Sequence, residues 1–478
     1  MSDGSSADKL AELLTAEVKR YPAGAKLPSS RELIGRFQVS PATMSRAIAL
    51  LAEAGLVSVR PGAGVFRSTA PQARVPVGDL SWQEVALNSG ADVPPRAIHA
   101  SAVLAALTDP PEEVVDLNGG YLHSSMQPEA ALAAALARAG RRPGVWSRPP
   151  ILGLPELRGW FARQIAGDTG MITADDIVLT NGGQTALGVV ARALTGPGGS
   201  VLVESPTYAG LLSILRTSGL RPVPIPMDEH GPRPDLLTDA FRTTRARLFI
   251  CQHTYQNPTG TTWPRQRRLD VLAIARQAGA FVLEDDFARL LGHADSPTAP
   301  LPLATKDNDG VVVHLRSLSK PTSPTLRVAA VSAHGPALER IRGLHAVEQF
   351  FVPRPLQEAT LELVSAPAWR RHLRTLSIEL RDRRNVIVAA VREHLPEVTV
   401  LTVPDGGYHL WLRLPDRIDE NRLVSEALHA GVAAMPGKVY FAADPPAPHL
   451  RLSYAAAPSR EHIIEGVRRL ATAFGRLR

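Results

Sequence analysis

Short apolar, β-rich runs alternate with helical patterns through most of the chain beyond residue 81. Helical stretches such as 184–194 and 265–278 separate successive runs. This alternation predicts an α/β fold built on a doubly wound, mostly parallel sheet. The apolar runs are Ile177–Thr180, Val201–Glu204, Leu248–Cys251, Phe281–Glu284, Val311–Leu315 and Val328–Val331.

Unusual polar residues follow the carboxyl ends of these runs, and their clustering predicts a ligand site. In a doubly wound sheet, ligands bind outside the carboxyl ends of the strands. These residues are Asn181-Gly182-Gly183, Glu204-Ser205, Gln256-Asn257, Asp285-Asp286 and Ser317.

The last hundred residues have a different rhythm. A helical stretch over 374–394 leads into apolar segments at 398–402 and 407–414, and a second helical stretch covers 420–430. This order predicts a smaller α+β domain.

The first 68 residues predict a helix-turn-helix. Leu10, Leu13, Leu14 and Val18 form a helical stripe. Ser29 stands three residues before Glu32, a capping-box spacing that begins a second helix. Ser40 caps a third helix, whose apolar face is Met44, Ala47, Ile48 and Leu51.

A short hairpin follows the third helix. Residues 57–59 and 65–67 flank a Pro-Gly-Ala-Gly turn, and this arrangement is typical of a wing. Between residues 26 and 67 there are six Lys or Arg and two Glu. Contact with DNA phosphates requires such an excess, although a helical mini-domain with solvated charges has the same pattern.

Composition narrows the class of protein. The chain has 478 residues, 44% of them hydrophobic, and a net charge of +7 that permits a nucleic-acid partner. Its single cysteine, Cys251, excludes an intrachain disulfide and a cysteine-rich zinc site, and no metal site is predicted. The N-terminus lacks a signal-peptide pattern, and no run of ~18 apolar residues occurs. These features predict a soluble cytoplasmic protein without a membrane partner.

The segment LPSSRELIGRFQVSPATMSRAIALLAEAGLV resembles the winged helix-turn-helix of the GntR family, and the resemblance covers most of residues 8–67. It implies binding to double-stranded operator DNA. Ser30 and Ala42 depart from the family's usual charged residues. The residues that the resemblance places on DNA are Arg31, Arg36, Ser40, Thr43 and Arg46, with Gly62 in the wing.

Several motifs in the large unit suit an aromatic, phosphorylated cofactor. Asn181–Thr185 begins a helix directly after a strand, as a phosphate site requires. Each motif also has a simpler interpretation when taken alone: a helix cap, a turn, a solvated loop or a surface side chain. The other candidates are Tyr208 in ESPTY, Asn257 in YQNPTG, Asp285 in FVLEDDF, Lys320 and Arg327 in SLSKPTSPTLR, and Arg451 in HLRLSYA.

Together and in this order, the motifs resemble the fold-type I aminotransferases over roughly residues 95–478. That resemblance implies pyridoxal 5′-phosphate (PLP), held by Lys320 as a Schiff base and by Asp285 at the pyridine nitrogen. It places Asn257 at the cofactor's 3′ oxygen and Tyr208 on the ring. Arg451 is expected to bind the carboxylate of a substrate or effector. The phosphate is assigned to Gly183, Gln184, Ser317 and Arg327.

A GntR-type head on this fold resembles the MocR subfamily of bacterial regulators. It implies a homodimer in which the head of one chain lies near the large domain of the other. The expected divisions are a DNA-binding domain over 1–68, a linker over 69–94, a large PLP-binding domain over 95–378 and a small C-terminal subdomain over 379–478.

Three functions remain open from the sequence. The first is a transcriptional regulator that responds to PLP, to an amino compound or to both. The second is an active amino acid:2-oxo acid aminotransferase with an appended DNA-binding head, and the third is a simple cofactor sensor. Phe287 stands where relatives often have tyrosine, and the segment with Trp146 and Arg148 offers no tyrosine for a partner's site. These departures favour cofactor binding over turnover.

Overall fold

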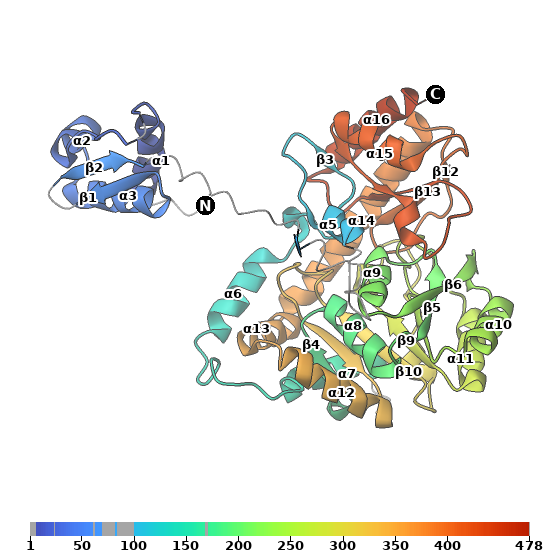
Figure 1. Cartoon of the computed structure of the whole chain (residues 1–478). Helices are drawn as coiled ribbons and strands as arrows, with labels where there is room; N and C mark the ends of the chain where they lie inside the picture. The colour runs from blue at the N-terminus through green and yellow to red at the C-terminus, as the bar shows by residue number, and fades with distance from the viewer. Residues whose placement is uncertain are drawn as a thin grey trace. The chain divides into compact units, whose positions relative to one another are not determined.

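The computed structural model describes residues 6–22, 24–60, 63–68, 82–83, 100–167 and 171–477 (Figure 1). Its internal contacts divide the chain into two compact units, Met1–Pro95 and Arg96–Arg478, each with its own hydrophobic core. Most of the expected linker, 69–94, lies outside the described residues. Within these ranges, no helix is long and apolar enough to span a membrane.

The first unit is the expected winged helix-turn-helix. Both expected N-caps are present: Ser29 and Glu32 form a reciprocal capping box, and the Ser40 side chain accepts a hydrogen bond from the Thr43 N–H. Gln38 ends the second helix in the left-handed conformation, which forms the turn. The elements are α1 (Ser6–Val18), α2 (Ser30–Phe37), α3 (Pro41–Glu53), β1 (Val57–Arg60) and β2 (Gly64–Arg67).

The core of this unit lies between α1, α2 and α3. Met44 and Ala47 of α3 are fully buried, as the sequence predicts, and Leu10 and Leu14 of α1 are buried in the same cluster. Leu13 is 62% exposed, so the predicted stripe on α1 is too wide. The buried residues of α1 are Ala7, Leu10, Leu14 and Val18, which share one face of the helix, and Leu13 lies beside that face.

An eight-stranded sheet organises the second unit, in the order β4-β11-β10-β9-β8-β5-β6-β7. The neighbours from β10 to β6 pair in parallel, whereas β11 and β7 are antiparallel to their neighbours. The prediction of a mostly parallel sheet is therefore confirmed. The strands are β4 (Ile177–Thr180), β5 (Ser200–Ser205), β6 (Arg221–Asp228), β7 (Gly231–Pro232), β8 (Leu248–Cys251), β9 (Phe281–Asp285), β10 (Val312–Ser317) and β11 (Ala329–Ser332).

Helices cover both faces of this sheet (Figure 1). Alternate residues along each strand belong to two different cores, as the period of two requires: Val282 faces one core and Leu283 the other. One core includes α6 (Glu129–Ala139), α7 (Pro155–Ala166), α10 (Pro234–Thr244), α11 (Arg265–Ala278) and α13 (Arg354–Ser365). The other core includes α8 (Gly183–Leu194), α9 (Ala209–Thr217) and α12 (Gly335–Gln349).

A smaller α+β layer follows, built on a four-stranded sheet in the order β12-β13-β16-β15. Its elements are α14 (Pro367–His394), β12 (Thr399–Val400), β13 (His409–Arg413), α15 (Glu420–His429), β14 (Val432–Ala433), β15 (Met435–Pro436), β16 (His449–Ser453) and α16 (Arg460–Gly475). Before the large sheet the chain forms α5 (Ser101–Leu107) and β3 (Val115–Asp116), and β3 pairs with β14.

The large and small domains are more interleaved than a boundary between residues 378 and 379 would imply. That position lies inside α14, which begins at Pro367 rather than near Arg374, with the proline in the first turn. Val115 and Leu117 pack in the same core as the C-terminal helices. A segment that precedes the large sheet therefore belongs structurally to the small layer.

The head's stability should depend on Met44, which is fully buried at the centre of its core. Met44→Ala leaves a cavity, and we expect it to lower the opening free energy of the head by about 2–5 kcal/mol. Hydrogen exchange of the full chain, followed by peptide mass spectrometry, measures this locally. Leu13→Ala, on the exposed side of α1, is the control and should change the same protection by less than ~1 kcal/mol.

Candidate functional site

The carboxyl ends of β4, β5, β8, β9 and β10 lie along one edge of the large sheet, because these strands run in the same direction. The chain that leaves this edge lines a cavity of about 410 Å³. Every residue expected to bind the cofactor or a carboxylate lines it: Gly183, Gln184, Tyr208, Asn257, Asp285, Ser317, Lys320, Arg327 and Arg451.

One end of the cavity is suited to an anion. Gly183 and Gln184 line it at the N-terminus of α8, where backbone N–H groups have no partner within the helix, and Ser317 lies next to them. Arg327 donates to the Asn181 carbonyl at 3.1 Å. Gly182 has φ +86°, which favours glycine, and a Cβ atom there would lie 2.5 Å from the Arg327 guanidinium and displace it.

Lys320 occupies the middle of the cavity. Its amino group donates to the Gly120 carbonyl at 2.7 Å and lies 3.8 Å from the centre of the Tyr121 ring. Burial, aided by the nearby Arg451 guanidinium, lowers the pKa of Lys320 to about 7. A substantial fraction of this amine is therefore uncharged, and so nucleophilic, at neutral pH.

Asp285 ends β9 and is held by Gln252. The Gln252 Nε2 group donates to Asp285 at 2.7 Å, and the Gln252 carbonyl oxygen accepts from the Asn257 backbone N–H at 3.0 Å. The second contact fixes the direction of the amide. Burial raises the pKa of Asp285 to about 6, although the bond from Gln252 favours the charged form.

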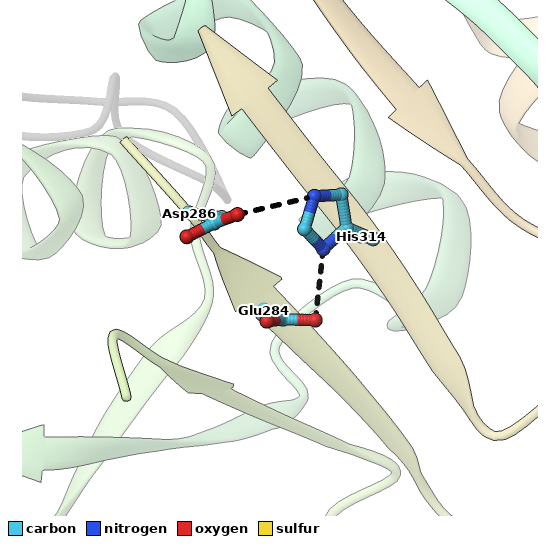
Figure 2. A group of neighbouring side chains, drawn as sticks. All are labelled: Glu284, Asp286 and His314. Carbon is cyan, nitrogen blue, oxygen red and sulfur yellow. Dashed lines mark hydrogen bonds and ion pairs between the residues drawn. The ribbon is translucent and has the colours of Figure 1, made fainter. Parts of the chain in front are cut away.

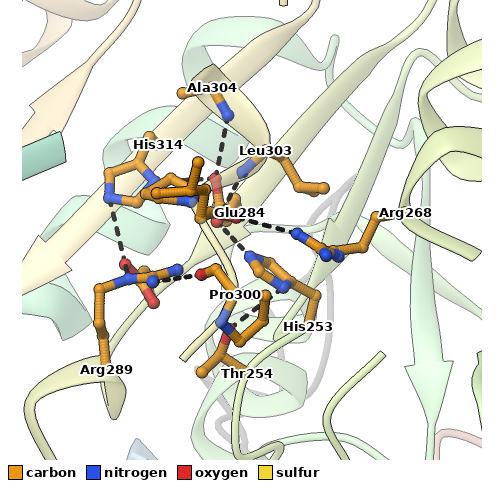
Figure 3. Close-up of polar contacts among 12 residues, drawn as sticks. His253, Thr254, Arg268, Glu284, Arg289, Pro300, Leu303, Ala304 and His314 are labelled. Atoms are coloured by element: carbon orange, nitrogen blue, oxygen red, sulfur yellow. Dashed lines mark hydrogen bonds and ion pairs between the residues drawn. The ribbon is translucent and has the colours of Figure 1, made fainter. Parts of the chain in front are cut away.

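The two carboxylates that flank Asp285 are bound on the other side of β9. Glu284 lies between two imidazoles, with His253 Nε2 at 2.5 Å and His314 Nδ1 at 2.8 Å, and it also accepts the Leu303 backbone N–H (Figure 3). His314 reaches from Glu284 toward Asp286 (Figure 2).

Arginines hold Asp286. Its Oδ2 atom accepts from Arg289 at 2.5 Å and from Arg316 at 2.6 Å. Burial alone would raise the pKa of Asp286, but these guanidinium groups lower it to about 2. Glu284, Asp286 and His314 are close enough to share a metal ion, yet their contacts already form a buried charge network with arginine and histidine.

Arg451 projects from β16 into the cavity beside Tyr440, with its guanidinium carbon 5.4 Å from the centre of that ring. It donates to the Asn118 backbone carbonyl. The Asn118 side chain in turn donates to the Ala105 carbonyl of α5 at 2.9 Å. Arg451 is 97% buried. A carboxylate in the cavity next to its guanidinium would therefore form a strong ion pair.

Several lining residues have no signal in the sequence motifs. Gln252 precedes the NPTG motif by several residues, and Tyr121 lies far from any of the motifs. Tyr408 is fully buried, and its hydroxyl donates to the Gly120 carbonyl at 2.6 Å. The apolar α5 forms part of the wall. Phe287, singled out by the sequence, also lines the cavity.

The head presents its candidate DNA contacts on α2 and α3. Arg31 and Arg46 are exposed, whereas Arg36 pairs with Glu17 of α1 at 2.7 Å. Ser40 and Thr43 bond to each other at the start of α3, so their first role is capping. Gly62 lies outside the described residues. Arg67 donates to the carbonyls of Lys19 and Tyr21, just after α1, and so ties the wing to the segment that follows the first helix.

Comparisons with known families agree with both units. Residues 112–470 match the family of class I and II aminotransferases, and residues 7–66 match the bacterial regulatory proteins of the gntR family. The chain belongs to the class I and II aminotransferase family and carries a gntR-type DNA-binding domain at its N-terminal end. This is the domain organisation of the MocR regulators.

Relatives of both kinds are similar to the chain. The uncharacterized HTH-type transcriptional regulator YdfD of Bacillus subtilis is 26% identical over 451 residues, which cover 94% of this chain and 91% of YdfD. The 2-aminoadipate transaminase of Thermus thermophilus is 32% identical over 400 residues, which cover 82% of this chain and 97% of that enzyme.

Among solved structures, the α-aminoadipate aminotransferase LysN of Thermus thermophilus, in complex with N-(5′-phosphopyridoxyl)-L-leucine, matches with a TM-score of 0.73 and 31% identity. The match covers 80% of this chain and 96% of LysN. The fold of the second unit is therefore that of PLP-dependent aminotransferases.

The cavity residues fit PLP. Asn257, Ser319 and Arg451 line the cavity, and each carries a buried polar atom without a hydrogen-bond partner among the described residues. Such atoms are rare in native proteins unless a ligand or water satisfies them. A phosphate at α8, a ring nitrogen at Asp285 and an aldehyde at Lys320 match the chemistry of the three parts of the cavity.

Gln252 should control the proton balance at Asp285. Gln252→Leu removes the bond that favours the carboxylate, so the pKa of Asp285 should rise above about 6. The Asp285 carboxylate, and not the neutral acid, binds a protonated ring nitrogen. When the pH is lowered, the variant should therefore lose PLP affinity at a higher pH than the wild type does. Titrations of PLP absorbance between pH 5 and pH 9, a range chosen to span roughly the group's midpoint, measure this shift.

Tyr208→Phe is the matched control. It removes the hydroxyl that donates to Gln184 at 3.0 Å and leaves the Gln252–Asp285 contact intact. Its affinity can change, but the midpoint of its pH profile should stay with the wild type. Equal midpoints for Gln252→Leu and the wild type would show that Gln252 does not govern Asp285.

Proposed function

We propose that this protein is a DNA-binding transcriptional regulator that holds PLP on Lys320 and responds to PLP together with an amino carboxylate. The observation that carries the proposal is the gathering of the expected cofactor residues around one cavity in a chain that also has a winged helix-turn-helix. Regulation requires that the ligand prefer one arrangement of the protein over another.

The residues of the cavity have distinct roles in this proposal. Bound PLP supplies an electron sink for reactions at the α-carbon of an amino acid. Asp285 holds a proton at the ring nitrogen, while Asn257 bonds the 3′ oxygen and Tyr208 covers the ring. Gly183, Gln184, Ser317 and Arg327 bind the phosphate. Arg451 orients the carboxylate of the amino compound, and its fork of N–H donors suits that group.

Operator recognition is assigned to the start of α3. The first turn of a recognition helix reads base edges in the major groove of DNA. Thr43 lies in that turn and Arg46 in the next one. Arg31 on α2 is a further candidate, and Gly62, outside the described residues, stays a candidate from the sequence alone. To bind DNA, Arg36 would have to give up its ion pair with Glu17 and contact a DNA phosphate instead. We further propose that the protein acts as a homodimer in the bacterial cytoplasm.

An aminotransferase that carries a DNA-binding head is the second candidate. The lowered pKa of Lys320 and the 32% identity to a transaminase favour it. The two candidates differ in whether incubation with PLP and an amino acid releases the matching 2-oxo acid. Release of at least one equivalent per chain supports the enzyme, whereas a reversible spectral change without release supports the regulator.

Lys320 should be the residue that holds PLP covalently. After incubation with PLP and reduction with borohydride, the wild type should retain a phosphopyridoxyl group in the peptide that contains Lys320, and Lys320→Ala should retain none. Lys438→Ala, an exposed lysine outside the cavity lining, is the control and should label like the wild type. Stoichiometric label on another lysine of the Lys320→Ala protein contradicts the assignment.

Arg46 should contribute to specific DNA binding. Arg46→Ala should weaken binding to a duplex from the protein's own promoter region by about 1–3 kcal/mol. Wild-type affinity should also fall steeply with added salt, because phosphate contacts release counterions. Fluorescence anisotropy with a scrambled duplex as competitor measures both effects. Arg20→Ala, beyond the end of α1, should bind within about twofold of the wild type.

A further inference from the structure

The charged groups of the cavity are nearly all assigned once PLP and a carboxylate are in place. Among the lining residues, the cations are Lys320, Arg327 and Arg451, and the carboxylate is Asp285. The proposed function uses each of them for the cofactor or for the α-carboxylate. His409 is buried, and burial holds its pKa well below the usual value, so it is neutral. Among the lining residues that this one chain supplies, no group is left to neutralise a charged side chain on the amino compound.

The wall that remains for that side chain is apolar. The helix α5 has the sequence SAVLAAL, without a charged residue. It contributes Ala102, Val103, Ala106 and Leu107 to the cavity lining. Ala102 and Ala106 also pack against a cluster that contains Met435 and Tyr440. The side chain of a bound amino acid would therefore meet methyl groups, a thioether and an aromatic ring.

The helix is lightly held, which suits an element that a ligand contacts. None of its residues is fully buried, and Leu104 on its outer side is 60% exposed. Its Ala105 carbonyl accepts the bond from Asn118, the residue whose own carbonyl accepts from Arg451. The α-carboxylate site and the apolar wall are therefore joined through one residue.

We propose that the amino compound bound by this cavity is an amino acid with an apolar side chain, and that α5 determines this specificity. The inference rests on the proposed function and narrows its effector to one chemical class. An apolar side chain loses its contact with water when it packs on α5, which is favourable. A carboxylate or ammonium group packed on α5 would find no charged partner on that helix, which is unfavourable.

Stable adducts of the cofactor test this specificity without turnover. The probes are N-(5′-phosphopyridoxyl) derivatives of L-leucine, L-glutamate and L-lysine, titrated into the full chain after PLP has been removed. The three adducts share the pyridoxyl phosphate and the α-carboxylate. The contributions of these groups cancel in a ratio of Kd values, which therefore reports on the side-chain site. We expect the leucine adduct to bind at least tenfold more tightly than the other two, a difference of about 1.4 kcal/mol.

Two substitutions on α5 locate the determinant. Val103→Arg adds a cation to the cavity wall and should lower the preference for leucine over glutamate at least tenfold. Leu104→Arg adds the same cation to the same helix, at an exposed position that does not line the cavity. It should leave the ratio within twofold of the wild type. PLP binding by both variants verifies that the cavity is intact.

The outcomes distinguish a failure of the proposed function from a failure of the apolar specificity. If the wild type binds none of the adducts and no PLP, the proposed function fails and this specificity fails with it. If PLP binds but the glutamate or lysine adduct binds as tightly as the leucine adduct, only the apolar specificity is overturned. If Val103→Arg and Leu104→Arg change the ratio equally, α5 is not the determinant.

Discussion

The architecture of the site depends on how three successive carboxylates are accommodated at the end of a buried strand. Glu284, Asp285 and Asp286 would be strongly unfavourable there without partners. The alternation of β9 separates them: Asp285 faces the cavity and bonds to Gln252, while its neighbours face histidine and arginine on the opposite side. Because the flanking charges are neutralised in place, Asp285 alone remains available to a ligand.

The anion-binding side of the cavity and its apolar wall are physically connected. Arg451 has an anion-binding face, but its other contacts lead through Asn118 to α5. A ligand can shift a protein only by the difference in its affinity for two arrangements. A molecule that contacts both Arg451 and α5 can impose such a difference, because it ties a rigid strand to a loosely packed helix. None of the residues assigned to PLP lies on α5.

Most of the framework follows from the sequence, since it depends on local patterns. The apolar runs predict the central strands, and the polar residues after them predict the site edge, because parallel strands must bring those ends together. Gln252 could not be predicted in this way. An amide after a strand becomes informative only when its partners, Asp285 and Asn257, are placed around it. Likewise, the segment SAVLAAL carries no motif, and only its place in the structure shows that it forms a helix lining the cavity.

The composition of the cavity favours recognition over rapid turnover. Phe287 lines it and offers no hydroxyl that could donate a hydrogen bond to a ligand. Tyr121 lies over the Lys320 amino group, and the Gly120 carbonyl accepts a bond from it, so in this arrangement the amine is stabilised by its own chain. Fast catalysis would need interactions that strengthen in the transition state. A sensor needs only that binding of the correct amino acid outweigh these contacts, and an apolar wall next to a buried arginine supplies that selectivity.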